Sequence, residues 1–331
     1  MGRNTLADRL KGYACFLVLF GHVIMGIRSA GVPVPVFFED LEQFIWSFHV
    51  ALFLFLSGVV YRLTGGWKSK KTKLGFIKHK LISLGIPYVL FSLVYILINS
   101  LVPGANTQAS VRDALDIWKT PIAQYWFLYA LFFLFCIWTA LGGVLKNWQI
   151  TAAVVIISYL LPLTGLSWGS LETVLYSALA FGVGTCMDLD WVEKLKASHR
   201  WKGVLFHAGI GVWLVVCGWS GATGVKEGMQ LLGILGSILL ISLLQRCKPI
   251  AGFLDFMNRY SFQIYLLHTI FTAGTRILLL RLGFDQWWLH VVLGFAAGLG
   301  FSVAAALVAR KIPVLDACFF PQKYLRKKKS K

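Results

Sequence analysis

Long apolar runs separated by short polar breaks are the feature that most limits how this chain of 331 residues can fold. A helix needs about 20 apolar residues to cross the hydrocarbon core of a bilayer, and runs of this order recur along the whole chain. We predict an all-α fold, a polytopic membrane bundle of about ten transmembrane helices. The predicted spans cover residues 11–29, 44–63, 81–103, 122–141, 149–163, 170–186, 203–219, 229–245, 260–280 and 287–309.

Composition excludes other classes of protein. Hydrophobic residues make up 57% of the chain and charged residues 14%, whereas a soluble domain is nearer about 45–50% apolar and about 25% charged. A water-soluble globule and a disordered chain are both excluded, because such an apolar chain cannot stay solvated. The six cysteines show no C-x-x-C spacing, so we expect free thiols, with no disulfide framework and no metal site.

Basic residues are distributed unevenly between the two predicted sides of the membrane. If the N-terminus is cytoplasmic, all but six of the 32 basic residues fall on the cytoplasmic side, where lysine and arginine accumulate. We therefore predict that both termini are cytoplasmic, with a transmembrane domain over residues 1–312 and a basic cytoplasmic tail over 313–331. This distribution explains the net charge of +18 without a nucleic-acid partner. The six outer residues are Arg28, Arg112, Lys119, Lys226, Arg276 and Arg281.

Ionisable side chains inside membrane spans are costly and are therefore candidates for function. In the first span, Lys11 and His22 are eleven residues apart, about three helical turns, so they share one face. Lys11 lies at the predicted cytoplasmic mouth and His22 near mid-membrane, and Asp8 can pair with Lys11 across one turn. The alternative is a lysine that snorkels to the headgroups and a histidine bonded to a neighbouring helix.

The second and ninth spans each carry another histidine. His49 enters the second span from the outer side, and Ser57 lies two turns deeper; in the ninth span, Tyr265 and His268 take adjoining positions on one face. Helix packing would explain any one of these groups. Three intramembrane histidines among so few other charges instead favour proton handling or catalysis. His290 is a weaker candidate, and we expect His79, His199 and His207 to be solvated.

The fourth span begins with two aromatic residues, Tyr125 and Trp126, at its predicted outer end. Aromatic rings gather at membrane interfaces for purely physical reasons. A platform for stacking a sugar ring would use the same residues, and composition does not separate these two interpretations.

Four motifs follow one another along the chain: D-x-L-K-G with His22, then FHVALFLFLSG, WFLYALFF and SFQIYLLH. In these segments the chain resembles the membrane-bound acyltransferase 3 family, most closely its fucose 4-O-acetylase-like sugar O-acetyltransferases. The resemblance implies transfer of an acetyl (acyl) group from cytosolic acetyl-CoA to a hydroxyl of a cell-surface or lipid-linked glycan. It also implies a multi-pass protein of the bacterial plasma (inner) membrane.

The family's first-helix signature is an arginine, ten residues, then a histidine. Here the histidine falls on His22, but the arginine position holds Lys11, which keeps the charge and loses the planar guanidinium fork. Arg9 is two positions away and is predicted to face elsewhere. The other motifs map onto Phe48 and His49, Ser57 and Gly58, and Tyr265, Leu266, Leu267 and His268.

Acyl transfer to a hydroxyl needs a base for the alcohol proton, stabilisation of the oxyanion and exclusion of water. We expect His22 to act as the general base or, alternatively, as a covalent acyl carrier. The predicted catalytic residues are His22, Lys11 and His49. The predicted donor-binding residues are Asp8, Lys11, Arg62 and Lys68. The predicted acceptor-binding residues are Ser57, Tyr125, Trp126, Tyr265 and His268.

A transporter or flippase for a glycan-lipid intermediate is the main alternative, with the histidines as a proton relay. Against it stand the scarcity of carboxylates in the spans, where only Glu172 comes close, and the lack of visible repeat symmetry. A purely structural membrane scaffold would leave the four ordered motifs unexplained.

Overall fold

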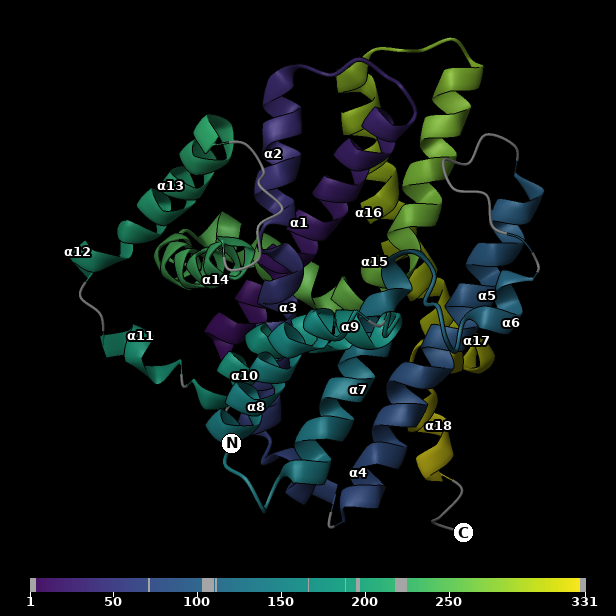
Figure 1. Ribbon diagram of the computed structural model, residues 1–331. Coiled ribbons are helices and arrows are strands. Elements are labelled where there is room, and N and C mark those ends of the chain that lie inside the picture. Colours follow the sequence, from purple (N-terminus) through teal and green to yellow (C-terminus); the bar gives the residue numbers. More distant parts are fainter. Residues whose placement is uncertain are drawn as a thin grey trace. The chain divides into compact units, whose positions relative to one another are not determined.

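The computed structural model describes residues 4–70, 72–102, 110, 112–165, 167–187, 189–194, 197–217 and 225–327. Within these ranges the regular structure is helical, apart from one isolated bridge between Gly142 and Leu145, which confirms the predicted all-α class (Figure 1). The chain divides into two compact units. Unit 1 is Met1–Leu56 with Met187–Ala304, and unit 2 is Ser57–Cys186 with Ala305–Lys331.

Unit 1 contains the N-terminal helices and the long helices near the C-terminus. Its elements are α1 (Thr5–Ser29), α2 (Val36–Trp46), the first half of α3 (His49–Leu63), α11 (Asp190–Lys194), α12 (Ala197–Arg200), α13 (Lys202–Cys217), α14 (Val225–Leu244), α15 (Lys248–Arg281) and most of α16 (Trp287–Lys311).

Unit 2 contains the middle of the chain and its C-terminal turns. Its elements, besides the ends of α3 and α16, are η1 (Gly66–Lys70), α4 (Lys73–Lys80), η2 (Leu81–Gly85), α5 (Ile86–Leu101), α6 (Asp113–Asp116), η3 (Ala123–Tyr125), α7 (Trp126–Leu141), α8 (Asn147–Leu160), η4 (Leu161–Thr164), α9 (Ser170–Tyr176), α10 (Ala178–Cys186), α17 (Pro313–Phe319) and α18 (Pro321–Lys327).

Seven helical stretches of the described chain are long and apolar enough to cross a membrane, so this is a multi-pass membrane protein. The predicted spans 170–186, 203–219 and 229–245 also fall largely in helices. The first is interrupted at Ser177, between α9 and α10, and the apolar stretches in the other two, Lys202–Leu214 and Gly228–Leu244, are shorter than the seven. A count of ten therefore stays a prediction, as does the orientation. The seven stretches are Thr5–Ser29, Val36–Leu63, Lys73–Leu101, Ala123–Leu141, Asn147–Thr164, Lys248–Arg281 and Trp287–Lys311.

Helix α15 is much longer than the predicted ninth span, 260–280. It has 34 residues, about 51 Å of helix, which exceeds the roughly 30 Å hydrocarbon core. The first turns of α15 contain charged side chains, which lower their hydropathy, so hydropathy alone does not show where this helix begins. Its last turns correct a second prediction: Arg276 lies in this helix and not in an outer loop. Arg276 is buried, and its Nη1 donates to the carbonyl of Gly26, 3.1 Å away.

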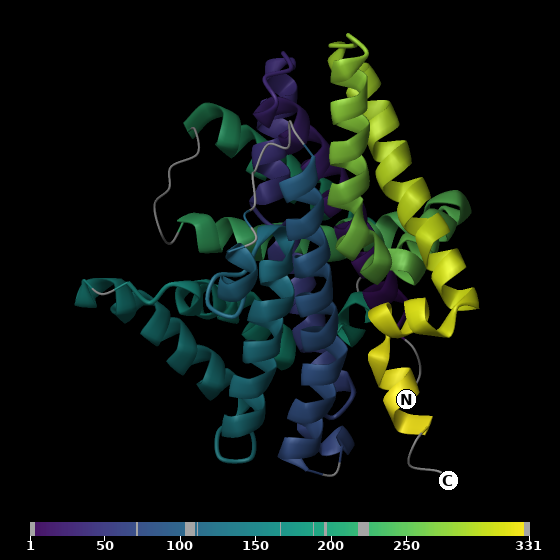
Figure 2. The same cartoon turned by 90° about the vertical axis from the view of Figure 1, so that its right-hand side faces the viewer.

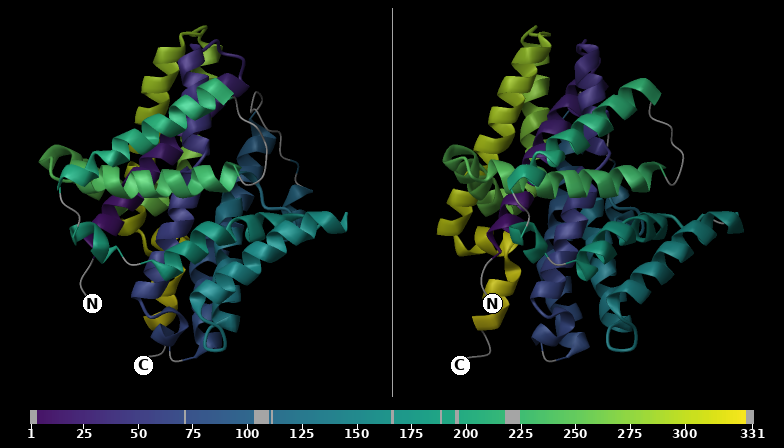
Figure 3. Two further views of the ribbon diagram at one scale, coloured as in Figure 1. Left: turned by 60° about the vertical axis from the view of Figure 1, so that its left-hand side comes forward. Right: turned by 90° about the vertical axis from the view of Figure 1, so that its left-hand side faces the viewer.

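The core of unit 1 forms where α1 packs along α15, because a glycine on α1 permits a close approach. A Cβ atom at Gly12 would overlap the backbone carbonyl of Leu254. At the same end of α1, the Arg9 guanidinium grips both carboxylate oxygens of Asp255, each at 3.1 Å. Figure 2 shows α16 beside α15, and Phe271 and Phe301 join these two helices. Helices α13 and α14 lie side by side in Figure 3.

Unit 2 packs around α7 through aromatic side chains. The rings of Phe135 and Phe181 lie 5.4 Å apart, and Trp138 contacts Phe181 at 5.0 Å. Gly58 brings α3 close to α10, since a Cβ there would overlap the carbonyl of Phe181. The Ser57 and Gly58 motif thus has a packing role in unit 2, as its glycine predicts.

The described part of the predicted basic tail is helical and packed. Helix α17 contacts α5, where the rings of Phe91 and Phe319 lie 5.1 Å apart. Asp316 is buried and accepts from Lys323 at 3.1 Å and from Tyr324 at 3.0 Å. The predicted tail residues 328–331 lie outside the described residues.

Candidate active site

Three histidines and a tryptophan meet inside unit 1, which brings together motifs that are far apart in the sequence. The ring of His22 on α1 lies 4.9 Å from that of His268 on α15 and 5.0 Å from that of Trp46 at the end of α2, in edge-to-face contacts. Trp46 also lies 4.4 Å from His49, the first residue of α3. We call these four residues the imidazole cluster.

Each histidine of the cluster is fixed by its own helix. The Nδ1 atoms of His22, His49 and His268 donate to the carbonyls of the residues four positions earlier, at 2.9, 2.7 and 2.7 Å. A carbonyl only accepts, so each Nδ1 carries a hydrogen. In a neutral imidazole the basic lone pair then lies on Nε2. The helices therefore present three rings with the same tautomer.

Two of these rings have a buried Nε2 lone pair that accepts no hydrogen bond from the described residues, and this makes the site unusual. The Nε2 atoms of His49 and His268 are buried and accept no hydrogen bond within the described part of the chain. Buried polar atoms are nearly always bonded, so two such atoms together point to a site for a hydroxyl or another donor. His22 is only partly buried, whereas His49 and His268 are about 1% and 0% exposed. A reactant therefore reaches His22 most readily.

A buried carboxylate supports the cluster, and sequence reasoning missed it. Glu42 on α2 is 8% exposed. It accepts from Trp46 Nε1 at 2.9 Å and from Arg28 Nη1 at 2.7 Å. The sequence does contain a hint of this contact, because Glu42 precedes Trp46 by one helical turn. The predicted span begins at residue 44, however, so Glu42 falls outside it. The pair with Arg28 ties the end of α1 to α2 and fixes the Trp46 ring.

The predicted span 44–63 lies within the apolar stretch Val36–Leu63, and a short break between α2 and α3 interrupts it. Ser47 and Phe48 lie between the two helices, and the Ser47 hydroxyl donates to the Phe44 carbonyl at 2.7 Å. The break sets Trp46 and His49 against each other.

The predicted donor-binding residues fall in both units. Lys11 is exposed on α1, and Asp8 interacts with it electrostatically. Arg9, two positions before Lys11, is paired with Asp255 on α15, so its guanidinium is already engaged. Arg62 and Lys68 are exposed in unit 2, near η1.

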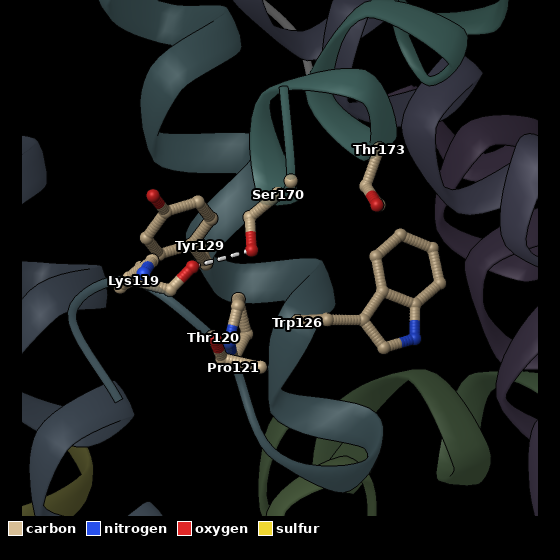
Figure 4. A pocket seen from close by; sticks show the side chains of 8 residues that line it. Lys119, Thr120, Pro121, Trp126, Tyr129, Ser170 and Thr173 are labelled. Carbon is tan, nitrogen blue, oxygen red and sulfur yellow. Dashed lines mark hydrogen bonds between the residues drawn. The ribbon is translucent and has the colours of Figure 1, made fainter. Parts of the chain in front are cut away.

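The predicted acceptor-binding residues are also separated. Tyr125 is fully buried and packs against Tyr95 at 6.0 Å, so its ring has no exposed face for a sugar. Trp126 stays partly exposed and lines a cavity of about 460 Å³ in unit 2 (Figure 4). Tyr265 lies one turn before His268, and its carbonyl accepts from that ring at 3.1 Å. Ser57 is partly buried on α3.

Two histidines outside the motifs differ from expectation. His207 was predicted to be solvated, but it is partly buried on α13, where its Nε2 is 3.4 Å from the Tyr13 hydroxyl and its ring contacts Phe48. Tyr13 and Phe48 are distant from His207 in the sequence, so the local sequence could not show that they cover it. His290 is 1% exposed and donates to the Phe284 carbonyl at 2.9 Å, which gives it a structural role.

The fold and the imidazole cluster define a multi-pass membrane protein with titratable groups among its helices. The model of a known family, described as an acyltransferase domain, matches residues 6–307. The chain belongs to this acyltransferase 3 family and is an acyltransferase, which confirms the family predicted from the motifs. No curated protein and no solved structure matches the chain. The closer likeness to fucose 4-O-acetylase-like enzymes stays a prediction.

Family membership supports the enzyme over the transporter or flippase. Among the described residues, no group of three or more His, Cys, Asp and Glu side chains is arranged to hold a metal ion.

Proposed function

We propose that this chain is a membrane-embedded O-acyltransferase that moves an acetyl (acyl) group from cytosolic acetyl-CoA to a hydroxyl of a cell-surface or lipid-linked glycan. The observation that carries the proposal is the imidazole cluster, in which three anchored rings present basic Nε2 atoms within an acyltransferase fold. The proposed location is a bacterial plasma membrane, with both termini and the donor on the cytoplasmic side.

In the proposed reaction, His22 Nε2 takes the proton of the acceptor hydroxyl as its oxygen attacks the thioester carbonyl. The tetrahedral intermediate then expels the CoA thiolate, which receives the proton from His22. The products are the acetyl ester and free CoA. In the alternative route, His22 Nε2 attacks the thioester carbonyl and expels the CoA thiolate. The acceptor oxygen then attacks the acetyl-imidazole, which releases neutral His22, and the hydroxyl proton passes to the CoA thiolate.

The tautomer of the His49 ring favours one of two proposed roles for this residue. With hydrogen on Nδ1, the neutral His49 ring can only accept at Nε2. It therefore suits the orientation of an acceptor hydroxyl better than the stabilisation of an oxyanion. His268 has the same geometry and shares this role.

Lys11 is proposed to bind the anionic donor at the cytoplasmic end of α1. It lies eleven residues before His22, about 16 Å along the helix, a distance that an extended pantetheine arm can cover. Asp8 acts on the ammonium group electrostatically. Arg62 and Lys68, with the other lysines near η1, are proposed to add positive charge for the phosphates.

Replacing Lys11 with glutamine should weaken donor binding by about fivefold, the effect of losing one solvent-exposed ion pair. The measurement is the dissociation constant of labelled acetyl-CoA for detergent-purified protein. Lys11→Arg is the matched control, and it should bind with near-native affinity because the family carries arginine here. An unchanged affinity in Lys11→Gln would rule out this role.

Replacing Glu42 with alanine should lower kcat about tenfold and leave the donor dissociation constant unchanged. The Trp46 indole loses its acceptor, so the Trp46 ring that packs against His22 becomes less well ordered. A small displacement of a reacting group lowers the rate strongly. Glu42→Gln keeps an oxygen for the indole and should retain more activity. Asp40→Ala, two positions away, is the control. An equal loss in Asp40→Ala would contradict a specific role for Glu42.

The whole proposal is tested by two measurements on the native chain. Purified protein should bind labelled acetyl-CoA, and mass spectrometry should find an acetyl ester on surface glycan from cells that express the gene and none from cells that lack it. Binding of acetyl-CoA without any change in the glycan would remove the proposed acceptor class. A lack of donor binding would remove the proposed donor.

A further inference from the structure

The cavity in unit 2 combines the surfaces that recognise a sugar. Trp126 and Tyr129 from α7 supply two partly exposed rings, and Thr120, Ser170 and Thr173 supply three hydroxyls. Figure 4 shows the Thr173 hydroxyl pointing toward the Trp126 indole. Its volume of about 460 Å³ falls within the range of roughly 300–1,000 Å³ of small-molecule sites.

A hydrogen bond holds the two walls of this cavity together. The Ser170 hydroxyl donates to the Lys119 carbonyl at 2.6 Å, which joins the loop before α7 to the start of α9. The next turn is fixed by backbone conformation, because Ala123 has φ of 46°, a left-handed value that is uncommon for alanine. Trp126, three residues later, begins α7, and its ring lines the cavity.

The cavity lining carries positive charge and no negative charge among the described residues. Of the described residues that line it, Lys119 is the charged one, and no carboxylate lines it. Outer segments of this chain hold few basic residues, so membrane topology does not explain a lysine here. A cation beside an aromatic ring and hydroxyls is suited to an anionic group on a sugar.

Unit 2 also places this cavity at the N-terminal end of α7, opposite the end that meets the basic connection, the lysine-rich residues 62–80 that precede η2. The C-terminal end of α7 contacts that connection, where Lys73 Nζ donates to the Ala140 carbonyl at 2.8 Å. Trp126 is fourteen residues earlier, about 21 Å along the helix. If the basic connection is cytoplasmic, as its charge predicts, the cavity faces the outer side, where a surface glycan is available.

We propose that this cavity binds an anionic acceptor, a sugar whose ring stacks on Trp126 and whose carboxylate or phosphate pairs with Lys119. The inference rests on the proposed function and narrows its acceptor to acidic glycans or phosphorylated, lipid-linked sugars. These two sources share one chemistry, an anionic group beside a pyranose ring.

The test measures equilibrium binding to the detergent-purified full chain without acetyl-CoA. The probes are a fluorescently labelled glucuronate disaccharide, glucose 1-phosphate as a competitor, and a labelled glucose disaccharide as the neutral match. We expect an anionic probe to bind more tightly than the neutral one and to weaken as salt rises. Preference for glucuronate indicates an acidic glycan, and preference for the phosphate indicates a phosphorylated sugar.

Variants separate the charge from the stacking surface. Lys119→Gln should lower the affinity for the anionic probe about fivefold and leave the affinity for the neutral probe unchanged. Lys119→Arg should bind both probes like the native chain. Trp126→Leu should weaken all probes. Arg112→Gln removes a charge from the same outer segment but not from the cavity, so it is the matched control and should have no effect.

Several results would overturn the inference: equal affinity for neutral and anionic sugars, no binding of either anionic probe, or equal effects of Lys119→Gln and Arg112→Gln. Its failure is distinguishable from that of the proposed function. If acetyl transfer depends on His22 but anionic binding does not depend on Lys119, only this inference fails. If anionic binding depends on Lys119 and acetyl transfer is not detected, only the proposed function fails.

Discussion

Replacing His22 with alanine is expected to lower acetyl transfer by at least about 100-fold while the protein stays folded in the membrane. General base catalysis typically contributes about 10²–10⁴-fold, and His22 is the partly exposed histidine of the cluster. The measurement is transfer of labelled acetyl from acetyl-CoA to purified glycan, with monodispersity on size exclusion as the test of folding. His199→Ala, an exposed histidine on α12, is the matched control and should retain activity.

The same variant distinguishes the two chemical routes. Protein mixed with labelled acetyl-CoA and no acceptor should carry a label on His22 only if the imidazole is an acyl carrier. A label that is present in the native chain and missing in His22→Ala supports the carrier route, and no label in either supports direct transfer. Full activity of His22→Ala would refute both roles.

Replacing Gly12 with alanine is expected to destabilise the fold by about 1–3 kcal/mol, the usual cost of overpacking. The added Cβ would overlap the Leu254 carbonyl, which is backbone and cannot rotate away. Helices α1 and α15 would therefore separate, and they carry two of the three cluster histidines, His22 and His268. The measurement is the temperature at which half of the detergent-solubilised protein stays monodisperse.

Gly252 provides the control for this substitution. It lies on α15 two residues before Leu254, and a Cβ there meets nothing within 4 Å. Gly252→Ala should leave the thermal midpoint unchanged or raise it slightly, since alanine favours helix. Equal midpoints for Gly12→Ala and Gly252→Ala would show that close packing at Gly12 does not stabilise the protein.

Much of the candidate site could be predicted because its residues lie in helices whose register is local. The spacing of Lys11 and His22 needs only the pitch of one helix, and burial of the cluster histidines follows from the apolar runs around them. Each Nδ1 bond is also local, since it reaches the carbonyl of the preceding turn. Charge and hydropathy likewise sufficed for the membrane class.

Other features depend on segments that meet only in three dimensions. In the sequence, Glu42 is an ordinary acidic residue before a predicted span. In the structure, it accepts hydrogen bonds from Arg28 and Trp46. From the sequence, His207 is predicted to be a solvated loop histidine. In the structure, its ring contacts Tyr13 and Phe48. By charge alone Arg276 is grouped with the outer basic residues, but its buried guanidinium donates to the carbonyl of Gly26, which is distant in the sequence.

By itself, therefore, the sequence determined a helical membrane protein with three intramembrane histidines, because helix length, apolar runs and helical pitch are local properties. Only the tertiary structure decided that His22 and His268, 246 positions apart, contact each other and that Glu42 accepts from the Trp46 indole. It also decided that Tyr125 is buried while Trp126 lines a cavity. The physical reason is that hydropathy assigns a side chain to the bilayer region, whereas close packing between helices decides which neighbour it meets.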